Sequence, residues 1–383
     1  MTTRHFALGE ICSFVGGGTP SRKTPEYFTG DIPWATVKDF KSLTIVDTEE
    51  HITEEALKNS ASNIVNAGTV LLVTRVGLGK VAIAGTRLAI NQDIKAVLPN
   101  NDDVQPEYLF WFLLSQASRI QAMGTGATVK GVTLKDVRAL RVPVPPLDEQ
   151  RRIVDLLSRA EGIVRLRREA QAKAAEIIPA LFLDMFGDPA TNPKDWPRLP
   201  LGELGKLDRG KSRHRPRDAQ ELYDGPYPFI QTGDVTNSGG RITRYSQTYS
   251  ELGLAQSRLW PAGTLCITIA ANIARTGVLC FDACFPDSIV GFTSGESVLT
   301  DYIQQWLGFL QPTLEANAPQ AAQKNINLNI LRSLPVPVPP LSLQSAFANR
   351  TEIARAITTR QTTALATAQA AFDGLLHRSF VFT

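Results

Sequence analysis

The chain has 383 residues, of which 43% are hydrophobic and 20% charged, and its net charge is +3 at pH 7. This length exceeds one ordinary hydrophobic core and predicts two to four domains. The sequence contains no apolar stretch long enough to span a membrane and no N-terminal run typical of an export signal. We therefore expect a globular protein of the cytoplasm, and the small net charge does not by itself indicate a nucleic-acid partner.

In chain order, the first elements are short β-like runs broken by glycine turns, such as GTVLLVTRV at residues 68–76 and KVAIAG at 80–85. A helical pattern follows over residues 106–123. A polar loop, a short strand and the proline stretch LRVPVPPL at 140–147 come next. This order predicts a mixed α/β domain over residues 1–146, with Trp34 in its core.

A long helical pattern begins directly after the prolines and predicts a central helix over residues 147–187. We expect Asp148 to cap its start, Gly187 to end it, and Pro179 to kink or break it. A continuous helix of this length would rise about 60 Å. Its apolar positions recur at helical spacing: Ile153, Leu157, Ala160, Val164, Ile177, Leu181 and Met185.

The second half of the chain repeats the first. LGEI at residues 8–11 returns as LGEL at 201–204, and LRVPVPPLDEQ at 140–150 returns as LPVPVPPLSLQ at 334–344. The separation stays between 193 and 196 residues, so the chain is a tandem duplication. Other positions paired at this separation are Trp34 with Phe229, Asp39 with Asp234, Ile94 with Ile289, Tyr108 with Tyr302, and Lys130 with Lys324.

The duplication predicts a second domain over residues 188–340 and a C-terminal helix over 341–383, with Ser342 in the capping position of Asp148. Its apolar stripe is expected to be Ile353, Ile357, Ala364, Ala368, Ala371 and Leu375. Two long helices with equivalent stripes would bury them against each other as an antiparallel, coiled-coil-like spacer between two pseudo-symmetric domains. The alternative is that each helix packs on its own domain.

Antiparallel packing of two equivalent helices creates an approximate two-fold axis, a symmetry that duplex DNA shares. The framework positions are repeated, whereas GGGTPSRKTPEYF in the first domain and RGKSRHRPRDAQELY in the second have little identity. Residues 206–217 include six Lys or Arg and one Asp, which suits either a solvated loop or phosphate contact. This combination is the one expected if a common framework carries two separate specificities.

Motifs for catalysis are missing from the sequence. Pro-Pro never occurs in the tetrapeptide with which amino-methyltransferases hold a target base, and residues 74–81 depart from a Walker A motif at Thr74 and Val81. We expect a hairpin turn across residues 74–80 instead. The four cysteines, Cys12, Cys266, Cys280 and Cys284, lack metal-binding spacing, so we expect buried free thiols. We expect no catalytic residue, metal or cofactor in this chain.

The order of domain, helix, domain, helix and the repeated PVPPL boundary resemble the specificity subunit of type I restriction–modification systems. The resemblance extends from Leu8 to Phe380, and it is most specific at residues 68–73 and 125–154. The second copy departs from the pattern at LSLQ, residues 341–344, and at 318–324, which leaves the roles of its loops open.

The resemblance implies a non-enzymatic subunit that recognises a bipartite, asymmetric DNA sequence through two target-recognition domains. It implies assembly with two modification subunits that methylate adenine with S-adenosylmethionine, and with restriction subunits that use ATP. The helices would set the spacer between the half-sites and dock the modification subunits. Two rival hypotheses stay open: a protein–protein scaffold of tandem repeat domains, and a self-contained DNA methyltransferase.

Residue type and position in expected loops select the candidates for DNA contact, because Arg, Lys, Asn and Gln read bases and bind phosphates. In the first domain the candidates are Arg22, Lys23, Lys38, Arg75, Lys80, Asn91, Gln92 and Lys130. In the second domain they are Arg209, Lys211, Arg213, Arg215, Gln231, Arg241, Arg244, Asn272, Arg275 and Lys324.

Overall fold

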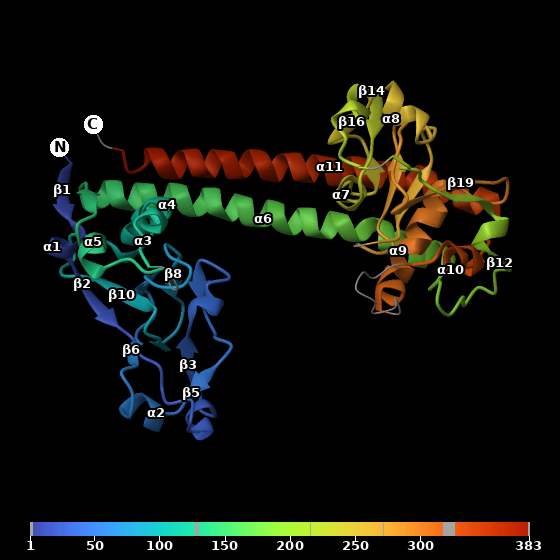
Figure 1. Ribbon diagram of the computed structural model, residues 1–383. Helices are drawn as coiled ribbons and strands as arrows, with labels where there is room; N and C mark the ends of the chain where they lie inside the picture. The colour runs from blue at the N-terminus through green and yellow to red at the C-terminus, as the bar shows by residue number, and fades with distance from the viewer. Residues whose placement is uncertain (1–2, 127–129, 215, 271, 317–325, 382–383) are drawn as a thin grey trace. The chain divides into compact units, whose positions relative to one another are not determined.

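The computed structural model describes residues 3–126, 130–214, 216–270, 272–316 and 326–381. The chain divides into two compact units, one formed by Met1–Glu169 with Thr363–Thr383 and the other by Ala170–Thr362. Each unit contains one globular α/β domain and parts of both long helices, α6 (Leu147–Phe186) and α11 (Leu341–Arg378) (Figure 1). The mixed α/β class predicted from the sequence is confirmed.

The first domain is built on a five-stranded sheet with the order β2-β10-β7-β8-β4. Its pairs are antiparallel except for β4 with β8, which is parallel. Val70 of β7 pairs with Ile83 of β8, so the expected hairpin across the glycine turn is confirmed. The strands are β2 (Cys12–Gly16), β4 (Thr44–Ile45), β7 (Val70–Val73), β8 (Val81–Ala84) and β10 (Ile94–Pro99).

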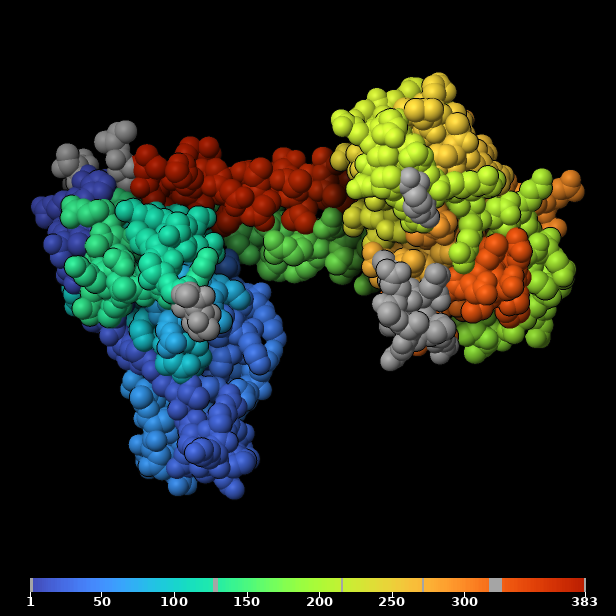
Figure 2. Space-filling view, in the orientation of Figure 1, coloured from blue at the N-terminus to red at the C-terminus, as the bar shows by residue number. Residues whose placement is uncertain are grey.

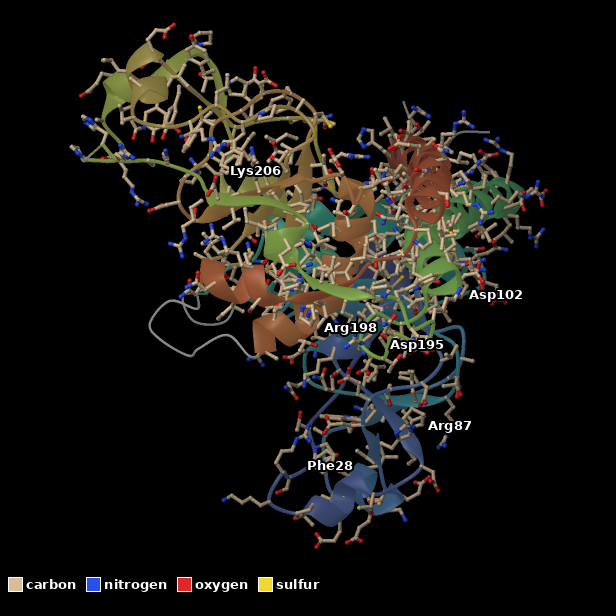
Figure 3. The ribbon with its side chains drawn as sticks, turned by 90° about the vertical axis from the view of Figure 1, so that its right-hand side faces the viewer. Phe28, Arg87, Asp102, Asp195, Arg198 and Lys206 are labelled. Atoms are coloured by element: carbon tan, nitrogen blue, oxygen red, sulfur yellow. The ribbon has the colours of Figure 1, made fainter. Side chains whose placement is uncertain are left out.

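A smaller sheet forms the distal part of the first domain, seen as the narrow blue end in Figure 2. Its order is β5-β3-β9-β6, and it buries Trp34, which is 2% exposed, as predicted. The ring of Phe28 packs edge-on against Trp34, and Figure 3 shows Phe28 at this end of the domain. The strands are β3 (Ile32–Ala35), β5 (His51–Ile52), β6 (Asn63–Val65) and β9 (Leu88–Ile90).

Helix α3 (Pro106–Ser115) lies in the core of the first unit, where every residue from Tyr108 to Leu113 is buried. The pattern over residues 106–123 therefore gives two helices, α3 and α4 (Ala117–Ala122), instead of one. Two aromatic rings of α3 contact the C-terminal part of the chain: Trp111 contacts Phe372 of α11, and Tyr108 contacts Phe380. The C-terminal part of α11 thus completes the core that the first domain begins.

The second domain repeats the central sheet with the order β13-β19-β17-β18-β15, and β15 with β18 is again the parallel pair. In its distal part β14 (Tyr223–Phe229) pairs with β16 (Gln247–Tyr249), and an isolated bridge joins Phe229 to Cys284. Within the described residues, the four-stranded sheet of the first domain is therefore not repeated. Phe229 is 3% exposed and lies in the core, as predicted. The central strands are β13 (Gly205–Arg209), β15 (Arg241–Ile242), β17 (Leu265–Thr268), β18 (Thr276–Leu279) and β19 (Ile289–Ser294).

The proline stretches join each domain to a helix. In the first unit β11 (Arg141–Val144) pairs with β1 (Arg4–Ala7), and in the second β20 (Pro335–Pro337) pairs with β12 (Arg198–Pro200). Each ladder ties the end of its domain to the beginning of that domain. A long helix starts three residues after β11, at Leu147, and four residues after β20, at Leu341. The repeated sequence therefore forms the same connection twice. We call each one a joint, residues 141–150 in the first unit and 335–344 in the second.

The predicted helix caps are wrong by two residues. The carbonyls of Pro146 and Pro340 already accept the first helical hydrogen bonds, from Glu149 and Leu343 respectively, at 2.9 and 3.0 Å. Asp148 and Ser342 therefore lie within the first turn, where Asp148 pairs with Arg151 at 3.0 Å. The rigid proline occupies the capping position, because its missing N–H is not needed there.

A buried glutamine fastens each joint. Gln150 is 0% exposed; its carbonyl accepts from the Gln105 N–H at 3.0 Å, and its amide donates to the carbonyls of Asp103 and Pro145 at 2.8 and 2.9 Å. Gln344 makes the equivalent set of three hydrogen bonds, with Leu299, Ser297 and Pro339. Figure 3 labels Asp102 at this end of the first domain.

The two long helices run antiparallel within the second unit. Contacts pair Gln171 with Thr362, Ala174 with Thr358, and Phe186 with Phe347, so the residue numbers rise along α6 as they fall along α11. In the first unit Val164 and Phe372 share one core with the domain. The helices therefore pack on each other and on their domains, which combines the two alternatives left open by the sequence.

Helix α6 continues through Pro179 and ends at Phe186. Gly187 has a φ of +81°, and its N–H bonds the Leu183 carbonyl at 2.9 Å, which confirms the predicted glycine stop. The predicted stripe of α11 is partly wrong, since Ile353 and Ile357 are 65% and 38% exposed.

The buried positions of α11 include Phe347, Thr351 and Ala354. The buried face is therefore shifted by one residue from the stripe predicted through Ile353 and Ile357. Small and hydroxyl side chains let the two helices approach each other. Such side chains give a weaker hydrophobic signal in the sequence than Ile353 and Ile357, which suggested the wrong face. On α6, Ile153, Leu157, Val164 and Met185 are buried as expected, whereas Ile177 is 37% exposed.

Candidate nucleic-acid interface

Three segments of the first domain converge at one end of its central sheet. The Thr74 N–H bonds the Asp93 carbonyl at 2.8 Å, and the Val132 N–H bonds the Thr74 carbonyl at 3.0 Å. A further bond of 3.3 Å joins the Val76 N–H to the Lys130 carbonyl. The loop between β7 and β8, the loop before β10 and the segment at 130–132 therefore form one surface, which carries Arg75, Gln92 and Lys130.

Several cations on this surface are exposed. Arg75 lies 3.8 Å from Asp93, and its side chain remains 52% exposed. Lys80 donates to the Val37 carbonyl at 3.5 Å, which brings the turn of exposed Lys38 beside the same hairpin. The structure thus groups Lys38, Arg75, Lys80 and Lys130, four candidates that are spread over more than ninety residues of sequence.

Gln92 and Asn91 differ in their accessibility. Gln92 is exposed and accepts a hydrogen bond from Thr19, which links the glycine-rich segment to this surface. Asn91 is only 5% exposed, and its amide donates to Asp93 at 3.3 Å. Asn91 supports the loop, and we do not include it among the exposed candidates.

Arg22 belongs to the distal part of the first domain. It forms a two-pronged ion pair with Glu50 and lies 4.2 Å from the ring centre of Phe28. The hydrogen bond with Glu50 raises the pKa of Arg22 and lowers the pKa of Glu50, so both groups stay charged. Lys23 beside it is exposed. The Arg22 side chain is still 54% exposed despite these contacts.

The second domain brings the corresponding loops together. The Ile269 N–H bonds the Ser288 carbonyl at 3.0 Å, and the Thr268 N–H bonds the Arg275 carbonyl at 2.9 Å. Exposed Asn272 and Arg275 lie in this loop, and the Asn272 amide donates to Thr236 at 3.3 Å. The domain therefore presents polar side chains from the same sheet end, with different residues.

The basic segment after β13 is held at the side of this sheet. The Lys211 N–H bonds the Phe285 carbonyl at 3.0 Å, and Arg217 pairs with Asp287 at 3.0 Å. Arg209, Lys211 and Arg213 are exposed. Arg215 and Lys324, two other candidates, lie outside the described residues.

Arg241 has a structural role in the second unit. Its guanidinium lies 2.8 Å from Asp301 of α9 (Thr300–Ala316) and 2.9 Å from Glu352 of α11, while Arg355 lies 3.2 Å from Asp301. Burial and the nearby Arg241 charge lower the pKa of Arg355. Since Arg241 is only 27% exposed and fastens the domain to α11, we do not include it among the exposed candidates. Arg244 nearby is exposed.

A cavity of about 750 Å³ lies in the distal part of the second domain. Gln231 and Gln247 line it and are joined by a hydrogen bond between their side chains, beside Tyr245, which is 49% exposed. Gln231 was a sequence candidate, whereas Gln247 and Tyr245 were not. Both come from the segment around β16, in which residue type had selected only the cations Arg241 and Arg244.

Three of the four thiols are buried and are poor nucleophiles. Burial raises the pKa of the Cys12 thiol to about 12 and raises the pKa of Cys266 and Cys284 as well. Cys280 is exposed, which corrects the expectation that all four thiols are buried. Within the described residues, no cluster of His, Cys, Asp and Glu could hold a metal ion, and no helix is long and apolar enough to cross a membrane. The surfaces described above are suited to binding.

The fold and these surfaces define a duplicated chain whose two domains share one framework and present different polar and basic loops. Residues 2–174 and 193–362 match the family described as type I restriction modification DNA specificity domain. The chain therefore belongs to this family, the specificity subunits of type I restriction–modification systems, which are non-catalytic components of those complexes.

Two curated relatives show the extent of the sequence similarity. The chain is 31% identical over 277 residues to the type I restriction enzyme MjaIX specificity subunit of Methanocaldococcus jannaschii, covering 66% of this chain and 61% of that protein. It is 33% identical over 177 residues to the EcoR124I/EcoR124II specificity subunit of Escherichia coli, covering 44% of each chain. The chain thus spans less than two thirds of the length of these relatives.

Two solved structures share the fold over nearly the whole chain. One, from work on complex assembly and conformational transition of the type I restriction–modification system, has a TM-score of 0.63 at 19% identity and covers 99% of this chain and 97% of its own. The S subunit from M. genitalium has a TM-score of 0.55 at 14% identity and covers 100% and 97%. These matches confirm the arrangement of two domains with long helices.

Proposed function

We propose that the chain reads DNA sequence for a type I restriction–modification complex. Each domain recognises one half of a bipartite, asymmetric site, while α6 and α11 set the spacer between the halves and dock the modification subunits. The observation that carries the proposal is that the two domains keep one five-strand order and one joint, yet present different loops on that framework. A shared framework with different loops is the arrangement expected of two domains that recognise different DNA sequences.

The two kinds of exposed side chain have separate roles in this proposal. Lys38, Lys80 and Lys130 bind phosphates and fix the position of the first domain on the duplex. Arg75 and Gln92 lie on the same surface and can reach base edges, because their side chains are exposed and carry directional donors. In the second domain Lys211 and Arg213 are the phosphate ligands.

The proposed complex contains two modification subunits, which use S-adenosylmethionine to methylate adenine, and restriction subunits, which use ATP. Both cofactors are therefore expected on the partner subunits. In the proposed complex this chain recognises the DNA sequence and sets the distance between the two half-sites. A cytoplasmic location remains a prediction from the sequence.

The test is to express the chain together with modification subunits of a type I system and to map methylated adenines across the host genome. We expect one bipartite sequence with a constant spacer. Exchange of residues 1–146 for those of a relative should change one half only. A complex in which that exchange alters the base that is methylated, instead of its sequence context, contradicts the proposal.

The helices provide an independent test. Four residues inserted into both α6 and α11 lengthen each by about 6 Å. This length corresponds to about two base pairs of duplex, so the spacer should grow by about two base pairs while both halves stay the same. A matched insertion into an exposed loop of one domain should leave the spacer unchanged.

The rival hypotheses give different results in the same experiments. A self-contained methyltransferase predicts binding of S-adenosylmethionine by the isolated chain, measurable by calorimetry. A protein–protein scaffold predicts that the assembled complex binds DNA equally well with and without this chain. Either result would replace the proposed function.

A further inference from the structure

Gln231 and Gln247 form a side-chain pair in the distal cavity of the second domain, the first just after β14 and the second in β16, two strands that Figure 1 labels. Gln231 Nε2 donates to Gln247 Oε1, and both side chains are exposed. An amide has two N–H donors and one carbonyl acceptor. The N–H on the carbonyl side of the amide forms one edge with the carbonyl, and this edge can bind a ligand while the other N–H donates to Gln247.

Hydrogen bonds to Asp234 fix the backbone at Gln231. Asp234 accepts from the Gln231 N–H at 2.8 Å and from Ser246 at 3.2 Å, which ties the start of α7 (Thr232–Thr236) to the segment before β16. Gln247 follows Ser246 directly, so one carboxylate positions both members of the amide pair. The side-chain hydrogen bond then restricts the rotation of the Gln231 amide.

The first domain has an equivalent carboxylate with similar hydrogen bonds, but a different side chain stands at the position of Gln231. Asp39 accepts from the Thr36 N–H at 2.7 Å and from the Glu49 N–H at 2.9 Å, as Asp234 does for Gln231 and Ser246. Thr36 therefore occupies the position of Gln231, and its short hydroxyl donates to Asp39 at 2.8 Å instead of extending outward. The framework is repeated, but only the second domain presents an amide here.

The charges around the cavity favour a base edge over a phosphate. Asp218 and Asp224 line it, and Arg217, the arginine in its lining among the described residues, is already paired with Asp287 at 3.0 Å. Carboxylates repel a phosphodiester but accept hydrogen bonds from exocyclic amino groups of bases. Arg244, exposed and next to Tyr245, is the nearer candidate for a phosphate.

We infer that the Gln231–Gln247 pair reads an adenine in the second half-site. Adenine presents N7 as an acceptor and its N6 amino group as a donor in the major groove, and one amide edge matches both. Gln231 makes the two contacts, and Gln247 is a positioning residue. The inference rests on the proposed function and narrows it to one base and one pair of side chains.

The experiment selects DNA with the complex of this chain and its modification subunits, from a duplex library randomised in both half-sites. The wild-type complex should prefer A·T at one position of the second half-site. Gln231→Ala should reduce that preference by about ten- to a hundredfold. Gln231→Glu, which loses the N–H that N7 requires, should shift the preference from A·T towards a pair with cytosine.

Gln247 needs a test that a merely structural role would not satisfy. Gln247→Ala should weaken the preference for A·T at the same single position, while the rest of both half-sites is unchanged. Gln247→Glu should restore it, because a carboxylate still accepts the hydrogen bond from Gln231. Gln121, an exposed glutamine of α4 in the first domain, gives the matched control Gln121→Ala, with the A·T preference retained.

The outcomes separate the inference from the function on which it rests. If the wild-type complex selects no bipartite sequence, the proposed function fails. If it does and Gln231→Ala keeps the same base at every position, the inference alone is overturned. Equal loss of binding to all sequences in Gln231→Ala also overturns it, because a phosphate contact or a folding defect would act in that way.

Discussion

The clearest structural prediction concerns Gln150, which fastens α6 to the first domain. Gln150→Met keeps the length and volume of the side chain but removes three hydrogen bonds, of 2.8–3.0 Å, from a residue with no exposure. At about 1 kcal/mol net for each bond, the joint should lose about 3 kcal/mol. This free energy corresponds to a change of about a hundredfold in the equilibrium for local opening.

Hydrogen exchange of the full chain in its complex measures this change directly. The Gln105 N–H loses its acceptor in Gln150→Met, so peptides at the start of α3 should exchange about a hundredfold faster. Gln344→Met should produce the same effect at Leu299 and leave Gln105 unchanged. Gln121→Met, on exposed α4, should change neither. Unchanged exchange at Gln105 in Gln150→Met would refute the reasoning.

Two further predictions concern surface groups. Lys80→Ala should lower the salt dependence of DNA binding by about one unit of slope without changing the selected sequence, because one phosphate contact is removed; a changed sequence would show that Lys80 reads a base. A thiol reagent at pH 8 should label Cys280 well before the other cysteines, since burial raises the pKa of Cys12, Cys266 and Cys284 and leaves little thiolate there. Rapid labelling that persists in Cys280→Ser would contradict this assignment.

The sequence predicted the framework because duplication makes each signal appear twice. The hairpin across residues 74–80, the buried Trp34 and Phe229, and the glycine stop at Gly187 are all confirmed. The phase of α11 was mispredicted, because its packing depends on small side chains such as Ala354 that carry little hydrophobic signal.

The interface was harder to predict, because hydrogen bonding decides which polar side chains are available. Residue type alone does not distinguish Arg75, which is half exposed, from Arg241, which joins Asp301 and Glu352. Gln247 could not be found, because its significance comes from a partner sixteen residues away that only the folded chain brings to it. The roles of the exposed candidates in DNA contact remain predictions.

The two joints also bear on how a chain of this design could exchange one set of loops for another. Gln150 bonds only main-chain atoms of the first domain, and the Tyr108 hydroxyl likewise donates to the main-chain carbonyl of Pro143. Gln344 and Tyr302 do the same in the second domain. These hydrogen bonds therefore depend on backbone shape, whereas other contacts with the helices, such as Arg241 with Glu352 and Trp111 with Phe372, are made by side chains. A gene crossover that exchanged only the loops would preserve every one of these hydrogen bonds, so a domain can change its loops while its joint to the helix stays the same.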